Sequence, residues 1–105
     1  MKSTLREPYK IFFGTLANQY RLDIIKSLSE SEKTVTLLIK NLKFHQSTIS
    51  HNLRRLQTCG FVSVRKNGKE RIYSLNKKTI KPLLDLMHNH MNNYCKRIHG
   101  KNNTR

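Results

Sequence analysis

The chain of 105 residues carries a formal net charge of +15, because its 21 lysines and arginines far outnumber its six acidic residues. This length suits a single domain over residues 1–105, and the charge favours a polyanionic partner such as nucleic acid. No membrane contact is expected, since no apolar run approaches the roughly 18–20 residues that span a bilayer, and the first residues lack the apolar core of a signal peptide. We therefore expect a cytoplasmic protein.

Aromatic residues dominate the first predicted helix, over residues 5–17. Tyr9, Phe12 and Phe13 recur at helical spacing, and Pro8 is compatible with a helix only in its first turn. This apolar face is larger than a small domain needs for its own core. It can cover the core or form an interface between two copies of the chain.

Two further helices and a tight turn are expected before residue 46. Residues 20–29 carry apolar side chains at helical spacing, and Thr34 or Thr36 is placed to cap the next helix. Residues 43–45 then form a short connection to another helix. Residues 34–58 are therefore predicted to form a helix-turn-helix.

The helix predicted over residues 46–58 has two distinct faces. Ile49, Leu53 and Leu56 form an apolar stripe, which leaves polar and cationic side chains for the other faces. Small polar groups let a helix approach base edges in a DNA groove, while arginines reach phosphates. The predicted DNA-contacting residues are Gln46, Ser47, Thr48, Ser50, His51, Asn52, Arg54 and Arg55.

Residues 61–75 predict a basic β-hairpin. Asn67-Gly68 is a strong turn signal, with alternating apolar residues on either side. The predicted DNA-contacting residues of this wing are Arg65, Lys66, Lys69 and Arg71. A helix that can enter a groove, followed by a basic hairpin, predicts a mainly α winged helix-turn-helix protein that binds double-stranded DNA.

An unbroken apolar seam marks the last predicted helix, over residues 77–98. Its apolar residues are spaced alternately by three and four, as in helices that pair along a seam. We expect residues 5–17 and 77–98 to form a homodimer interface, which would set two half-sites about one turn of DNA apart. The alternative is that both helices simply cover the core. The predicted interface residues are Tyr9, Phe12, Phe13, Leu84, Met87, Met91 and Tyr94.

The segment STISHNL, from Ser47 to Leu53, is the most specific part of a pattern that runs over residues 16–75. This pattern resembles the ArsR/SmtB family of bacterial and archaeal regulators. The resemblance implies a dimeric winged-helix repressor whose DNA affinity is switched by a metal ion, an oxidant or another ligand. Lys43 stands where the family commonly has glycine and His45 where it commonly has a capping serine. We therefore expect a strained turn, or a helix capped by Ser47.

The resemblance leaves the effector open. Thr34 and Thr36 stand where the family has thiolate metal ligands, and they are poor ligands for soft metals. Asp85, His88 and His99 are candidates for a zinc-type site on the last helix, although their spacing departs from the family pattern. The simpler interpretation is that these histidines are solvated. A regulator without a bound metal, cofactor or small-molecule sensor is the leading expectation.

Two cysteines offer a redox alternative. Cys59 stands where a small core residue also fits, and Cys95 precedes two cations that favour a reactive thiol. An enzyme is not expected, because the chain lacks a glycine-rich phosphate loop and a convincing pair of acids. Ser50 and His51 are adjacent on a helix, so their side chains point apart.

Two functions are consistent with the sequence. The first is a sequence-specific DNA-binding transcription regulator of ArsR type, a dimeric repressor whose helix over residues 46–58 enters the major groove. The second is a low-specificity architectural or nucleoid DNA-binding protein, or a winged-helix module of a larger transcription complex. The first turn of that helix is polar rather than cationic, which favours base reading and hence the first function.

Overall fold

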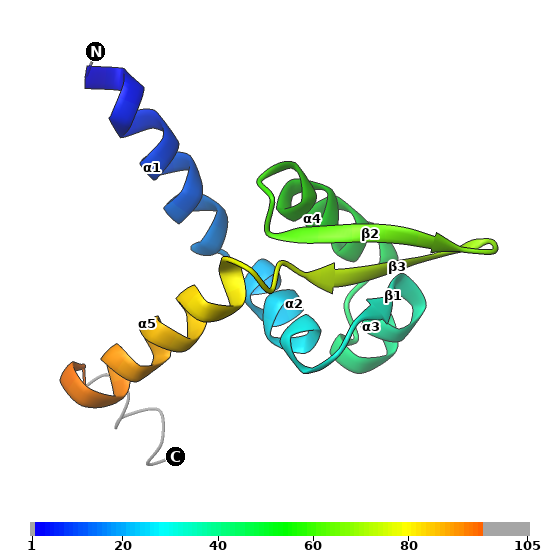
Figure 1. The fold of residues 1–105 in the computed structure, drawn as a ribbon. Coiled ribbons are helices and arrows are strands. Elements are labelled where there is room, and N and C mark those ends of the chain that lie inside the picture. Colours follow the sequence, from blue (N-terminus) through cyan, green and yellow to red (C-terminus); the bar gives the residue numbers. More distant parts are fainter. Residues whose placement is uncertain (1, 96–105) are drawn as a thin grey trace.

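The computed structural model describes residues 2–95 and has five helices and a three-stranded antiparallel sheet within them (Figure 1). In chain order the elements are α1 (Lys2–Leu16), α2 (Gln19–Glu30), β1 (Lys33–Thr34), α3 (Val35–Leu42), α4 (Gln46–Thr58), β2 (Val62–Asn67), β3 (Glu70–Leu75) and α5 (Ile80–Tyr94). The predicted winged helix-turn-helix class is confirmed. No helix among the described residues is long and apolar enough to cross a bilayer.

The core lies where α2, α3 and α4 pack together against the root of the hairpin. Its fully buried side chains come from all of these parts: Ile24, Leu38, Ile49, Leu53, Leu56 and Phe61. The three from α4 are the predicted apolar stripe, so the polar side of α4 is left toward solvent. Phe12 joins α1 to this core through a ring contact with Phe61, with ring centroids 5.1 Å apart.

The two-residue strand β1 was not predicted from the sequence. It pairs with β3, with Lys33 opposite Tyr73, and gives the sheet the order β1-β3-β2. Lys33 is buried, and its Nζ donates to the carbonyls of Ser27 at 2.6 Å and Ser31 at 3.2 Å and to the Ser31 hydroxyl at 3.0 Å. These oxygens satisfy all three donors of the ammonium group, which makes its burial tolerable.

The wing turn lies one residue later than the Asn67-Gly68 signal suggested. Asn67 pairs with Glu70 as the last rung of the hairpin, so Gly68 and Lys69 are the two central residues of the turn. Gly68 has φ of +69°, and Lys69 is not among the residues with positive φ. Positive φ at the first central residue alone is the pattern of a type II′ turn, whose twist matches that of the flanking strands.

The connection between α3 and α4 is strained, as expected. Lys43 ends α3 with φ of +61°, and its backbone N–H donates to the Ile39 carbonyl at 2.7 Å. At the other end of α3, the Thr34 hydroxyl accepts from the Leu37 N–H at 3.2 Å, so Thr34 rather than Thr36 is the cap. Within the described residues no side chain caps the start of α4, so the expected cap from Ser47 is absent.

Both terminal helices have bounds that differ from those predicted. Helix α1 begins at Lys2, so Pro8 lies in its interior rather than in its first turn. Helix α5 begins at Ile80 rather than at 77, because the Asn76 carboxamide oxygen accepts from the backbone N–H groups of Lys78 at 3.0 Å and Thr79 at 3.2 Å and closes a turn there. Its described part ends at Tyr94, and residues 96–98 of the predicted helix lie outside the described residues.

Helices α1 and α5 project away from the body on the side opposite the hairpin tip and diverge from each other (Figure 1). The radius of gyration is 15.3 Å, whereas a compact domain of this length has about 13 Å. The projecting helices account for this extended shape. Much of their surface is therefore left without a partner in one chain.

Candidate DNA interface

The polar face of α4 is exposed along its whole length. Six of the predicted DNA-contacting residues are exposed on it, namely Gln46, Ser47, Ser50, His51, Arg54 and Arg55, while Thr48 is half-buried. They follow one another at the one-, three- and four-residue intervals that define one side of a helix. The structure thus brings together hydroxyl, amide and imidazole groups near the start of α4 and guanidinium groups near its end.

Asn52 was predicted to contact DNA, and that prediction is wrong. Its side chain is buried, with only 5% of the residue exposed. Its Nδ2 donates to the Thr48 carbonyl at 2.8 Å, and its Oδ1 accepts from Nη1 of Arg21 at 3.3 Å. Asn52 lies three residues after Ile49, on the core side of the helix, so it holds neighbouring elements together instead of reaching a base.

Two shallow hollows flank the exposed face of α4. The first, of about 390 Å³, is lined by Asn18, Tyr20, Arg21, Ser47, Thr48, His51 and Asn52. The second, of about 270 Å³, is lined by Arg21, His51, Arg54, Arg55 and Thr58. Neither hollow is lined by an acidic residue, so both present positive or neutral groups. Arg21 was not predicted as a site residue, although it lies in the segment that resembles the family.

The cations of the wing differ in how they are partnered. Arg65 forms an ion pair with Glu32, with Nη2 and Oε2 2.7 Å apart, and both side chains are about half exposed. Lys66 and Arg71 face each other as cross-strand partners. Like charges in such a pair destabilise a hairpin. A polyanion bound across the wing would relieve this repulsion.

Few acidic groups neutralise the positive surface. The Arg65–Glu32 and Lys81–Asp85 pairs are the ion pairs found in the described part of the chain. The arginines of α4 and the other cations of the wing therefore have no carboxylate partner. Uncompensated cations on a recognition helix and on its adjoining hairpin suit contacts with phosphates.

The predicted interface residues divide between the core and the surface. Phe12 and Leu84 are partly buried against the core, and Met87 is half-buried. Tyr9, Phe13, Met91 and Tyr94 are exposed, at 63%, 58%, 42% and 76%. Ile11 and Leu86 are also exposed and were not predicted. Both original interpretations thus hold in part, since each terminal helix covers some core and also presents an apolar surface.

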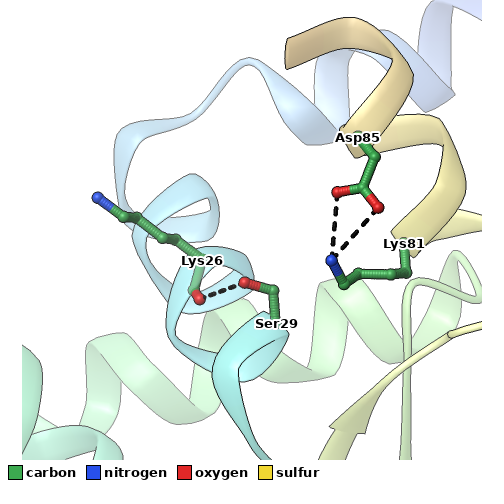
Figure 2. A network of polar contacts seen from close by, with 4 residues as sticks. All are labelled: Lys26, Ser29, Lys81 and Asp85. Carbon is green, nitrogen blue, oxygen red and sulfur yellow. Dashed lines mark hydrogen bonds and ion pairs between the residues drawn. The ribbon is translucent and has the colours of Figure 1, made fainter. Parts of the chain in front are cut away.

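The candidate metal ligands do not form a cluster in the described part of the chain. Asp85 accepts from Nζ of Lys81 at 3.2 and 3.3 Å on α5, while Ser29 donates to the Lys26 carbonyl at 2.6 Å on α2 (Figure 2). No group of three His, Cys, Asp or Glu residues suited to a metal ion occurs among the described residues. His99 lies outside them.

The two cysteines have different settings, and both are free thiols. The Sγ of Cys59 lies 3.5 Å from Oγ1 of the buried Thr15 and packs at the edge of the core. Cys95 follows the last residue of α5. The placement of Cys59 agrees with its predicted role as a small core residue.

Comparisons with known proteins identify relatives of one kind. A family model described as "Bacterial regulatory protein, arsR family" matches residues 18–64. The chain is 31% identical over 78 residues to the transcriptional activator HlyU of Vibrio cholerae, covering 74% of this chain and 72% of that protein. It is 36% identical over 61 residues to the arsenical resistance operon repressor of Staphylococcus xylosus, covering 58% of this chain and 59% of that protein.

Solved structures share the fold over most of the chain. The crystal structure of Rv0081 from Mycobacterium tuberculosis superposes with a TM-score of 0.82 at 28% identity, covering 89% of this chain and 94% of that one. A homodimeric winged helix-turn-helix DNA-binding domain from Mycobacterium bovis, Mb0332, gives a TM-score of 0.81 at 24% identity, covering 91% and 89%. The arrangement of α4 and the wing is therefore shared with known regulators.

Proposed function

The chain belongs to the ArsR family of DNA-binding transcription regulators, a class without enzymatic activity, and we propose that it acts as a homodimeric repressor of a palindromic operator. The observation that carries this proposal is the separation of two surfaces. The polar face of α4 and the basic wing present groups suited to DNA. The projecting helices α1 and α5 present apolar groups suited to a second copy (Figure 1).

In the proposed complex, α4 lies in the major groove. The small polar groups of its first turns, from Gln46 to His51, contact base edges, where side chains can distinguish all four base pairs. Arg54 and Arg55 contact phosphates and hold the helix in register. Lys66, Lys69 and Arg71 of the wing contact the backbone or the minor groove beside it.

Dimerisation is proposed to supply the affinity that one such module lacks. Exposed apolar residues on α1 and α5 support it, as does the homodimeric state stated for the Mycobacterium bovis domain of the same fold. Joining two modules makes the second binding event intramolecular and raises affinity without new contacts to DNA. A two-fold dimer requires an operator with inverted half-sites about one helical turn apart.

Repression rather than activation is proposed for the outcome of binding. The named relatives include both kinds, an activator and operon repressors. A small dimer that covers a promoter excludes polymerase without any further surface. In vitro transcription from the bound promoter tests this directly: repression lowers the transcript as protein is added, whereas an activator raises it.

Fluorescence anisotropy tests sequence-specific binding. The purified protein is titrated onto the duplex upstream of its own gene and onto a scrambled duplex of equal length, from low to physiological salt. The proposal expects a preference of about 10³-fold or more for the upstream duplex that persists as salt rises. Equal binding to both duplexes that vanishes with salt would instead favour the architectural function, provided that a genomic library yields no preferred site.

A further inference from the structure

Arg21, in the first turn of α2, is held in place beside the recognition helix. Its Nε donates to the Thr15 carbonyl at 2.8 Å, and its Nη1 donates to Oδ1 of Asn52 at 3.3 Å. Thr15 is fully buried and Asn52 nearly so, which makes both acceptors part of the rigid core. The guanidinium group is therefore fixed by two neutral oxygens from α1 and α4.

The charge of Arg21 has no carboxylate partner among the described residues. Neither ion pair found there includes it, and no acidic residue lines either hollow beside it. A guanidinium has five N–H donors, and three of those of Arg21 make no hydrogen bond within the described part of the chain. A half-buried cation with unused donors and no counterion favours an anionic ligand.

The surroundings of Arg21 place that anion next to the DNA-contacting face. Arg21 and His51 line both hollows that flank α4, so Arg21 lies between them. The first hollow adds the hydroxyls of Ser47 and Thr48, and the second adds two more arginines. These are donors of the kinds that bind the phosphodiester backbone.

From this geometry we infer that Arg21 is a prepositioned anchor for a phosphate of the DNA backbone, with Asn52 as the residue that orients it. The inference rests on the proposed DNA-binding function and adds a contact from α2 to those from α4 and the wing. A phosphate is favoured over a base, because Arg21 stands beside α4 rather than on its exposed face. The fixed fork of the guanidinium matches two phosphate oxygens at once.

The salt dependence of DNA binding provides the test, since each phosphate contact contributes about 0.9 to the slope of log K against log salt. Binding to a mixed-sequence duplex is measured for the full chain and for Arg21→Gln and Arg21→Lys. Lys26→Gln is the matched control, because it removes the same charge from an exposed position of α2, beside α5 (Figure 2). Circular dichroism establishes that each variant is folded.

We expect Arg21→Gln to lower the slope by about 1.8 for a dimer with two such contacts and to weaken binding about 60-fold at about 0.1 M salt. Arg21→Lys should keep the slope, because it keeps the charge, and Lys26→Gln should change it far less than Arg21→Gln. A slope for Arg21→Gln equal to that of Lys26→Gln would overturn the inference and leave Arg21 with a structural role only. Absence of DNA binding by the unaltered chain would instead refute the proposed function.

A second measurement uses the unaltered protein and so does not depend on the folding of a variant. Phenylglyoxal modifies accessible arginines, and mass spectrometry reports the extent of modification at each one. The anchor predicts that a bound duplex protects Arg21 along with Arg54 and Arg55. Equal modification of Arg21 in the free protein and in the complex would contradict it.

Discussion

Truncation of Phe13 on α1 tests whether the apolar faces of the terminal helices pair between two copies of the chain. Phe13 is 58% exposed and touches Phe12 edge-on, with ring centroids 5.2 Å apart. An aromatic side chain of roughly 200 Å² therefore leaves about 120 Å² for a partner to cover. At about 25 cal/mol per Å², this is about 3 kcal/mol per protomer and about 6 kcal/mol per dimer as an upper limit. If half of it is realised, Phe13→Ala raises the dimer dissociation constant by about 100-fold.

Sedimentation equilibrium over a range of protein concentrations measures that constant. Leu37→Ala is the matched control, because Leu37 is also exposed, at 41%, but lies on α3. It should leave dimerisation unchanged. Thermal unfolding of both variants, at one concentration, checks that the fold persists. The reasoning is refuted if Phe13→Ala dimerises as tightly as Leu37→Ala while both remain folded.

Three other predictions follow from local features. Lys43→Gly should raise the stability by about 0.5–1 kcal/mol relative to Lys43→Ala in urea unfolding, because glycine adopts positive φ without strain; equal stability would show that the turn is unstrained. In salt-dependent binding, Arg71→Ala should lower the slope by about 0.9 per protomer. Glu32→Gln should raise affinity by releasing Arg65, and weaker binding would contradict that role for the ion pair. Added zinc should not change DNA affinity in a gel shift, because Asp85 is paired with a lysine, and a metal-dependent shift would refute this.

Local signals in the sequence were sufficient for the recognition helix and for most of the wing. The apolar stripe of Ile49, Leu53 and Leu56 defined α4 with the bounds that the structure shows, because its period is set by the helix itself. The hairpin was predicted from its turn residues and alternation. The turn still moved by one residue, because the pairing of Asn67 with Glu70 is settled by the register of the whole hairpin.

Features that depend on distant contacts were not predictable in this way. Strand β1 has only two residues and exists because β3 lies beside it. Arg21 acquires its place from acceptors on α1 and α4. The error at Asn52 was avoidable, because its spacing of three from Ile49 and four from Leu56 places it in the buried stripe. Its polar character outweighed its position in the assignment.

Selection of binding sites from a pool of random duplexes tests the central claim most directly, because it does not depend on guessing the operator. The purified protein is incubated with the pool at physiological salt, and bound duplexes are recovered and sequenced over several rounds. The account predicts enrichment of an inverted repeat whose half-sites lie about one helical turn apart, as a two-fold pair of recognition helices requires. A final pool without an enriched motif, bound as tightly as the first, would contradict it.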